Sequence, residues 1–134
     1  MAATIIITAS YLLTAKDDSV RFEQQYGSFI DMQNKALAPL KASLDDSTLK
    51  QQLQAISLPE WEKAQQVIQA TSVYKLNDAF TKKRQLATQY AQMRIDQTNL
   101  LLKALEEKNV EKYQPQIDES GKAINAIVEE MNKQ

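Results

Sequence analysis

The sequence predicts an all-α protein, an antiparallel bundle of about four long helices with coiled-coil-like packing. The chain of 134 residues holds only 2 glycines and 3 prolines, so few residues interrupt a helix. Apolar residues recur at steps of three and four, which is the helical period. No segment alternates apolar and polar residues between turn signals, as a half-buried strand does.

The first amphipathic helix begins near Val20 and extends for about 25 residues. Its inward stripe comprises Phe22, Tyr26, Phe29, Ile30, Gln33, Leu37, Leu40 and Leu44. Pro39 lies inside this segment. An interior proline removes a backbone hydrogen bond, so we expect it to bend the helix or to end it a turn early.

The next segment begins at Asp45-Asp46-Ser47, whose short polar side chains can cap a helix. A short helix over about 48–56 would bury Leu49, Leu53 and Ile56. Ser57-Leu58-Pro59-Glu60 then has the form of a capping box with proline in the first turn. It predicts a new helix that carries Trp61, Ala64 and Ile68 inward.

Asn77 or Asp78 can cap the following helix, which ends near residues 106–109. Its inward stripe comprises Phe80, Lys83, Leu86, Tyr90, Met93, Gln97, Leu100 and Ala104. The sequence leaves open whether residues 57–108 form one long helix or two. The last helix, Val110 to Asn132, has the stripe Tyr113, Ile117, Ser120, Ile124, Ile127, Val128 and Met131.

We expect one helical-bundle domain over residues 17–134, preceded by an apolar segment over residues 1–16. Ala2 to Ala15 carries no charge. It is shorter than the roughly 20 residues of a membrane span, and it lacks the basic n-region of a secretory signal. Three interpretations stay open: the first core helix, the end of a transmembrane helix that begins upstream, or a degenerate signal sequence.

Composition excludes much familiar chemistry. The chain has no histidine and no cysteine, which removes thiolate nucleophiles, Ser-His-Asp triads and the usual zinc, haem and iron–sulfur ligands. The net charge of −1 lacks the basic excess of a nucleic-acid binder. Pairs such as Asp45-Asp46 fall at helix ends, and neighbours on a helix diverge by about 100°. We therefore predict no enzyme, no cofactor, and no catalytic or metal-binding residues.

Four residues are candidate contacts with a partner: Trp61, Tyr74, Lys83 and Gln97. Trp61 and Tyr74 belong to a set of amphipathic aromatic residues, and Trp61 follows Pro59 in the first turn of its predicted helix. Lys83 and Gln97 are polar positions within an apolar stripe. Such residues can fix register or partner number, or they can mark a helix edge that turns toward water.

These observations favour a non-enzymatic, extracytoplasmic helical domain of a membrane-attached or secreted bacterial protein. It would act by protein–protein contact or as a structural module, with residues 2–15 as its membrane attachment. Acidic residues follow Lys16 directly, whereas cytoplasmic flanks are enriched in Lys and Arg. The alternative is a soluble intracellular adaptor or regulatory bundle that forms homodimers. A third hypothesis is a ligand-binding bundle with a small apolar cavity between the helices.

Overall fold

The computed structural model describes residues 17–133 of the chain. The sequence hypotheses for residues 1–16 concern a segment outside these described residues. The described part contains helices and no strand, and its elements are α1 (Ser19–Lys41), α2 (Asp46–Gln52), the π-helical turn η1 (Leu53–Ser57), α3 (Leu58–Ala70), the 3-10 turn η2 (Thr71–Val73), α4 (Asp78–Glu106) and α5 (Val110–Asn132).

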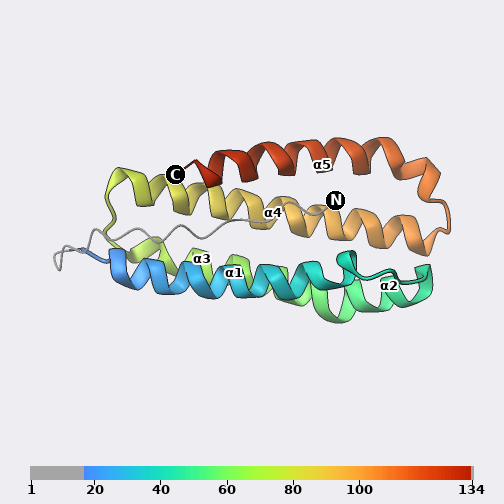
Figure 1. Ribbon diagram of the computed structural model, residues 1–134, viewed down its shortest axis with the longest axis horizontal. Coiled ribbons are helices and arrows are strands. Elements are labelled where there is room, and N and C mark those ends of the chain that lie inside the picture. Colours follow the sequence, from blue (N-terminus) through green and yellow to red (C-terminus); the bar gives the residue numbers. More distant parts are fainter. Residues whose placement is uncertain (1–16, 134) are drawn as a thin grey trace.

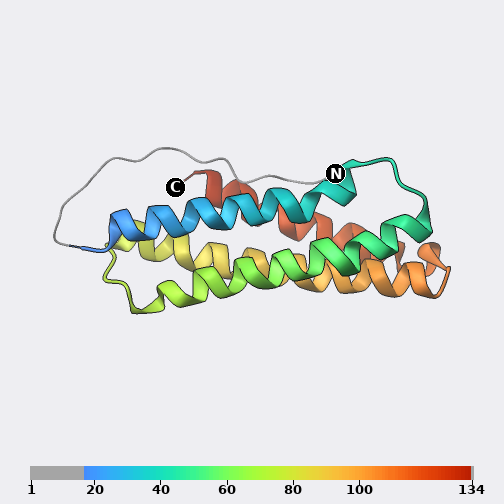
Figure 2. The same cartoon turned by 90° about the horizontal axis from the view of Figure 1, so that it is seen from below.

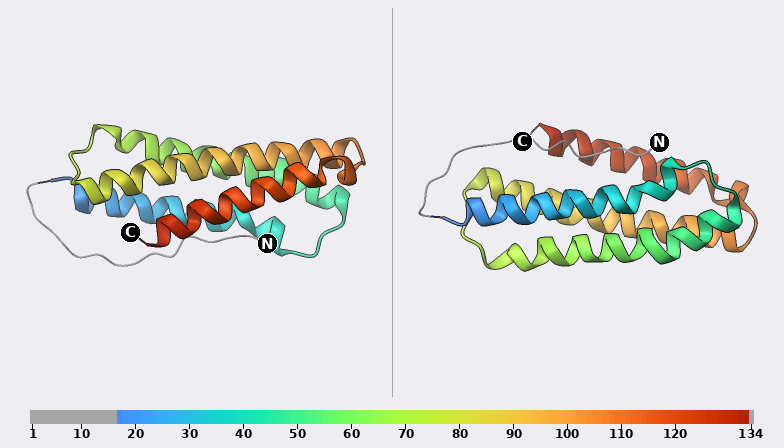
Figure 3. Two further views of the ribbon diagram at one scale, coloured as in Figure 1. Left: turned by 90° about the horizontal axis from the view of Figure 1, so that it is seen from above. Right: turned by 60° about the horizontal axis from the view of Figure 1, so that its bottom comes forward.

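The predicted all-α bundle is confirmed. Because α2, η1 and α3 follow one another without a break, they form one long rod, and four rods pack together in antiparallel order (Figure 1). Helix α1 packs against α3, α3 against α4, and α4 against α5. Figure 2 shows α1 alongside the α2–α3 rod. In the left view of Figure 3, α5 runs obliquely to α4.

Aromatic side chains fill the space between α1, α3 and α4. Phe22 of α1 meets Phe80 of α4 edge to face, with ring centroids 5.7 Å apart. Trp61 of α3 meets Tyr90 of α4 in the same manner at 5.6 Å. Edge-to-face pairs are a favoured geometry for buried rings. The predicted α1 stripe is therefore confirmed as part of the core, since Phe22 is fully buried with Tyr26, Phe29, Ile30, Gln33 and Leu37.

Helix α1 ends at Lys41, one turn before the predicted limit, and Pro39 lies in its last turn. This is one of the two effects that we expected of the proline. Asp45 then caps α2, because its carboxylate accepts a hydrogen bond from the Thr48 N–H at 2.7 Å.

Helix α3 begins at Leu58 with Pro59 in its first turn, as predicted, but the predicted capping role of Ser57 is wrong. Ser57 has helical dihedral angles and does not cap α3; instead its hydroxyl donates to the Ala36 carbonyl of α1 at 2.6 Å. The Leu58 N–H bonds the Leu53 carbonyl five residues back, in a π turn. This wider turn carries the helix past Pro59, which has no N–H to donate.

The same π turn overturns the expected burial of Ile56. One extra residue in the turn changes which side chain points inward, so Ser57 is buried whereas Ile56 is 38% exposed. Leu53 is fully buried, as expected.

The break between α3 and α4 answers the question that the sequence left open, since residues 58–106 form two helices separated by η2 and a short loop. Asn77 caps α4 by accepting the Phe80 N–H at 2.9 Å. Asp18 holds the loop to the start of α1: its N–H donates to the Lys75 carbonyl at 3.0 Å, and its carboxylate accepts the Lys75 N–H at 2.8 Å.

The inward face of α4 follows the predicted stripe as far as Tyr90 and again at Ala104. Between these two residues, Arg94 and Thr98 are buried, whereas Met93, Gln97 and Leu100 are only half-buried. Met93, Gln97 and Leu100 line a cavity together with residues of α5. These three residues, which we expected to face the centre of the bundle, therefore lie at the boundary between α4 and α5.

Candidate functional site

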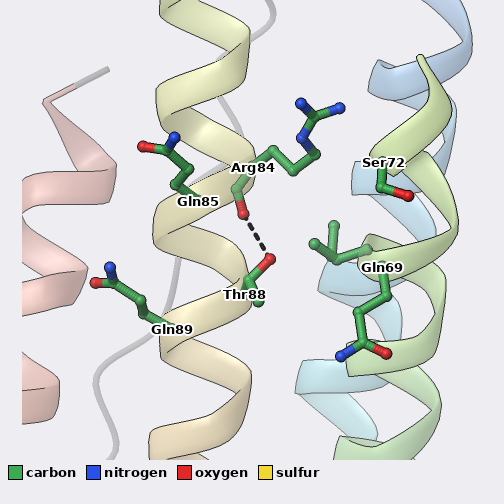
Figure 4. A pocket seen from close by; sticks show the side chains of 7 residues that line it. Gln69, Ser72, Arg84, Gln85, Thr88 and Gln89 are labelled. Carbon is green, nitrogen blue, oxygen red and sulfur yellow. Dashed lines mark hydrogen bonds between the residues drawn. The ribbon is translucent and has the colours of Figure 1, made fainter.

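A groove of about 490 Å³ lies between α3 and α4. Ile68, Gln69 and Ser72 line it from the α3–η2 side, and Arg84, Gln85, Thr88 and Gln89 line it from α4. Figure 4 shows Arg84 and Thr88 on the flank of α4 that faces α3, while Gln85 and Gln89 extend from the other flank. Helical spacing explains this division, because positions 84 and 88 lie one turn apart on one flank and positions 85 and 89 on the next.

Side-chain hydrogen bonds join the two sides of the groove at one end and just beyond the other. Arg84 Nη1 donates to the Thr71 carbonyl at 2.7 Å and, more weakly, to the Tyr74 carbonyl at 3.5 Å. One turn beyond the other end of the lining, Gln65 Nε2 donates to Gln92 Oε1 at 2.8 Å. These bonds fix the spacing of α3 and α4 on both sides of the groove.

Most of the lining surface of the groove is apolar, and the hydrogen-bonding groups that border it are almost all uncharged. Its three glutamine amides each both donate and accept, and Thr88 donates its hydroxyl to the Arg84 carbonyl at 2.9 Å (Figure 4). Arg84 is the one charged lining residue, and its guanidinium is engaged by main-chain carbonyls. This lining can recognise a polar surface, but it holds no acid–base pair and no base beside the Ser72 hydroxyl.

The structure does not bring the four predicted contact residues together. Tyr74 is half-buried below the guanidinium of Arg21, whose Cζ lies 4.6 Å from the ring centroid, and its carbonyl is at one end of the groove. Trp61 is only 1% exposed. It packs in the core, so its ring is not on the surface that a partner would meet.

Lys83 reaches from α4 toward α1. Its ammonium lies 3.8 Å from the Glu23 carboxylate and 4.5 Å from the centroid of the Tyr26 ring. Lys83 is 9% exposed. A buried cation is stable only when it is paired, so these contacts explain how a lysine can occupy the apolar stripe. Its role as a partner contact stays a prediction.

Gln97 and Trp61 both contact Arg94, a residue that the sequence pattern does not indicate as a candidate. Arg94 is 2% exposed. Its Nη1 donates to Gln97 Oε1 at 2.9 Å, and its Cζ lies 5.6 Å from the Trp61 ring centroid. Its Nε donates to the Tyr90 hydroxyl at 3.2 Å, which donates in turn to Gln33 Oε1 at 2.6 Å. A polar network therefore crosses the core from α1 to α4.

The buried tyrosines of the core are neutral phenols. Burial raises the pKa of Tyr26, and the nearby Glu23 carboxylate raises it further. Burial also raises the pKa of Tyr90, although Arg94 opposes this shift. Neither phenol can supply a phenolate near neutral pH, so the aromatic core offers structural hydrogen bonds and packing.

Within residues 17–133, no three His, Cys, Asp or Glu side chains gather as a metal site would require. None of the described helices combines the length and the apolar character needed to cross a bilayer. No protein family, curated protein or solved structure gives a significant match to the chain. The fold therefore defines the class, an all-α antiparallel bundle with a groove between α3 and α4.

Proposed function

We propose that this chain is a non-enzymatic helical module that acts by protein–protein contact, with the α3–α4 groove as its contact surface. One observation supports this proposal above the others: the groove combines apolar surface with bordering amides and hydroxyls, and its one charged residue, Arg84, is held by main-chain carbonyls. Such a lining suits recognition, because amides and hydroxyls match polar partners in geometry. It does not suit catalysis, which needs a positioned acid, base or nucleophile.

The partner that fits this groove is an uncharged polypeptide segment with exposed backbone or side-chain amides. Gln69, Gln85 and Gln89 each carry one acceptor and two donor hydrogens, the same groups as a peptide bond and an Asn or Gln side chain. A basic segment would meet the like charge of Arg84, and an acidic segment would compete with the two carbonyls that the guanidinium already bonds.

The proposed location is outside the cytoplasm, with attachment to a membrane through residues 2–15. The support is the uncharged character of Ala2 to Ala15 and the acidic pair Asp17-Asp18 that follows Lys16. Cytoplasmic flanks of membrane segments are typically enriched in Lys and Arg.

Site-specific photocrosslinking in the cells that naturally produce the chain tests the contact surface. A benzophenone amino acid at position 89, in the groove, should give a discrete adduct. The same amino acid at position 116 is the matched control, because Gln89 and Gln116 are both exposed glutamines and Gln116 lies on α5. Mass spectrometry of the adduct should identify a partner segment that contains few Asp, Glu, Lys or Arg residues.

Equal adducts at both positions, or no adduct at position 89, would contradict the proposal. A crosslinked segment that is rich in charged residues would contradict the proposed partner chemistry.

A further inference from the structure

A second concave site lies on the other flank of α4, at its boundary with α5. This cavity of about 200 Å³ has an apolar part formed by Met93, Leu100 and Ile124. Ile124 is 2% exposed, so it forms a floor against the core. An apolar cavity of about 150 Å³ holds one benzene molecule. The α4–α5 cavity is partly open to solvent, and its volume accommodates one six-membered ring and a short substituent.

At the polar end of the cavity, the side-chain amide of Gln97 offers a hydrogen-bond donor. Gln97 Oε1 accepts from the Arg94 guanidinium at 2.9 Å, which orients the amide so that Nε2 points toward Ser120. The contact from Gln97 Nε2 to Ser120 Oγ is long, at 3.4 Å, whereas the Ser120 hydroxyl donates to the Ile117 carbonyl at 2.9 Å. An amide nitrogen has two hydrogens, so Gln97 can donate to an oxygen in the cavity.

The negative charge of Asp96 at the cavity favours a neutral ligand over an anionic one. Asp96 lines the cavity and accepts a hydrogen bond from Gln92 Nε2 at 3.0 Å. Its carboxylate repels an anion, while the Arg94 guanidinium does not line the cavity. A carboxylate ligand would therefore lose hydration beside a like charge.

We propose that the α4–α5 cavity binds a small neutral molecule that consists of one apolar ring and one carbonyl oxygen. The ring packs on Met93, Leu100 and Ile124, and the oxygen accepts a hydrogen bond from Gln97 Nε2. Because the ligand contacts both α4 and α5, its binding also stabilises the packing of α5, whose main helical neighbour is α4. The site does not share a lining residue with the α3–α4 groove, so each proposal can fail without the other.

Acetophenone is a suitable probe, since it joins one aromatic ring to one carbonyl. Titration of the full chain, followed by the methyl NMR signals of Met93 and Ile124, should give saturable shifts with a Kd on the order of millimolar. Benzoate has the same shape with a negative charge, and it should bind at least tenfold more weakly. Thermal unfolding in acetophenone should shift to a higher temperature.

Two substitutions with a matched control locate the binding. Ala123→Trp fills the cavity from a lining position and should abolish the shifts. Ala126→Trp is the control, because Ala126 is also an exposed alanine of α5 but does not line the cavity, and it should leave the acetophenone Kd unchanged. Gln97→Met keeps the length of the side chain without its donor and should weaken acetophenone about fivefold, because the carbonyl oxygen loses its hydrogen-bond donor.

Three results would overturn the proposal. The first is the absence of saturable shifts at 10 mM acetophenone. The second is binding of benzoate with equal affinity, and the third is acetophenone binding that survives Ala123→Trp. Circular dichroism of the Ala123→Trp chain establishes that it folds, so loss of binding can be assigned to the filled cavity.

Discussion

Replacement of Tyr90 by phenylalanine isolates the polar network in the core. The tyrosine hydroxyl donates to Gln33 Oε1 at 2.6 Å and accepts from Arg94 Nε at 3.2 Å. The phenylalanine ring keeps the packing against Trp61 and Phe29, whose ring centroids lie 5.6 Å and 6.3 Å from that of Tyr90. The variant therefore removes both of these hydrogen bonds and keeps the aromatic ring in place.

The expected cost follows from the two buried partners. A buried group that loses its hydrogen-bond partner costs about 1–3 kcal/mol. Arg94 retains its bond to Gln97, so we take the lower end of this range for each partner and expect a loss of about 2 kcal/mol in the free energy of unfolding. Unfolding entropy is about 2.1 cal/mol/K per residue, or about 0.28 kcal/mol/K for 134 residues. The melting temperature should therefore fall by about 7 °C.

Tyr26→Phe is the matched control for this measurement. Tyr26 is also buried, at 2% exposure, but its hydroxyl makes no hydrogen bond within the described residues. Removing an unbonded buried hydroxyl should leave stability unchanged or raise it by up to about 1 kcal/mol. Urea titrations of both variants give the free energies. A loss below about 0.5 kcal/mol for Tyr90→Phe, or an equal loss for both variants, would refute the role of the network.

Three further predictions concern helix boundaries. Ser57→Ala should lower the free energy of unfolding by about 1–3 kcal/mol, because the buried Ala36 carbonyl loses the Ser57 hydroxyl; a change within about 0.5 kcal/mol in urea titration would contradict this. Asn77→Ala should cost about 1 kcal/mol through loss of the α4 cap, seen as a lower thermal midpoint. The Thr48 N–H lowers the pKa of Asp45 from its ordinary 3.8, so this stabilisation is complete above pH 3.8 and is lost as the pH falls through the lowered folded-state pKa. Between pH 4 and pH 2 the wild-type chain should therefore lose more stability than Asp45→Asn, and equal losses would show that this cap does not titrate as described.

Much of the fold could be predicted because each helix has a stripe of apolar residues. The stripe that begins at Phe22 is buried as far as Leu37, as the period predicts, and Asn77 and Asp45 cap the helices where their short polar side chains indicated. Local patterns carry this information because they depend on neighbours within one or two turns.

The sequence could not predict features that depend on contacts between distant segments. Ser57 resembles a cap, but its hydroxyl bonds a carbonyl 21 residues away in sequence. The sequence pattern does not indicate Arg94, because a charged residue is expected on the surface and only the folded chain places it beside Trp61. Lys83 was noticed because it interrupts an apolar stripe, although Glu23, its partner, could not be identified from spacing alone.

The α3–α4 groove illustrates the same difficulty. Gln85, Gln89 and Gln92 recur on one exposed face of α4, and this repetition was visible in the sequence. That they form one groove with Gln69 follows only from the packing of α3 against α4. The Gln65–Gln92 hydrogen bond joins these two helices, although its partners are 27 residues apart in sequence.

The size of the native assembly tests most directly whether the chain acts by contact through this groove. Gln69→Trp places an indole ring over the groove, and Gln66→Trp is its control, because both are exposed glutamines of α3 and only Gln69 lines the groove. In gentle extracts of the cells that naturally produce the chain, wild type and Gln66→Trp should elute together in a complex well above 15.2 kDa, while Gln69→Trp elutes at a smaller size with an unchanged melting temperature. Identical elution of all three chains would contradict the account.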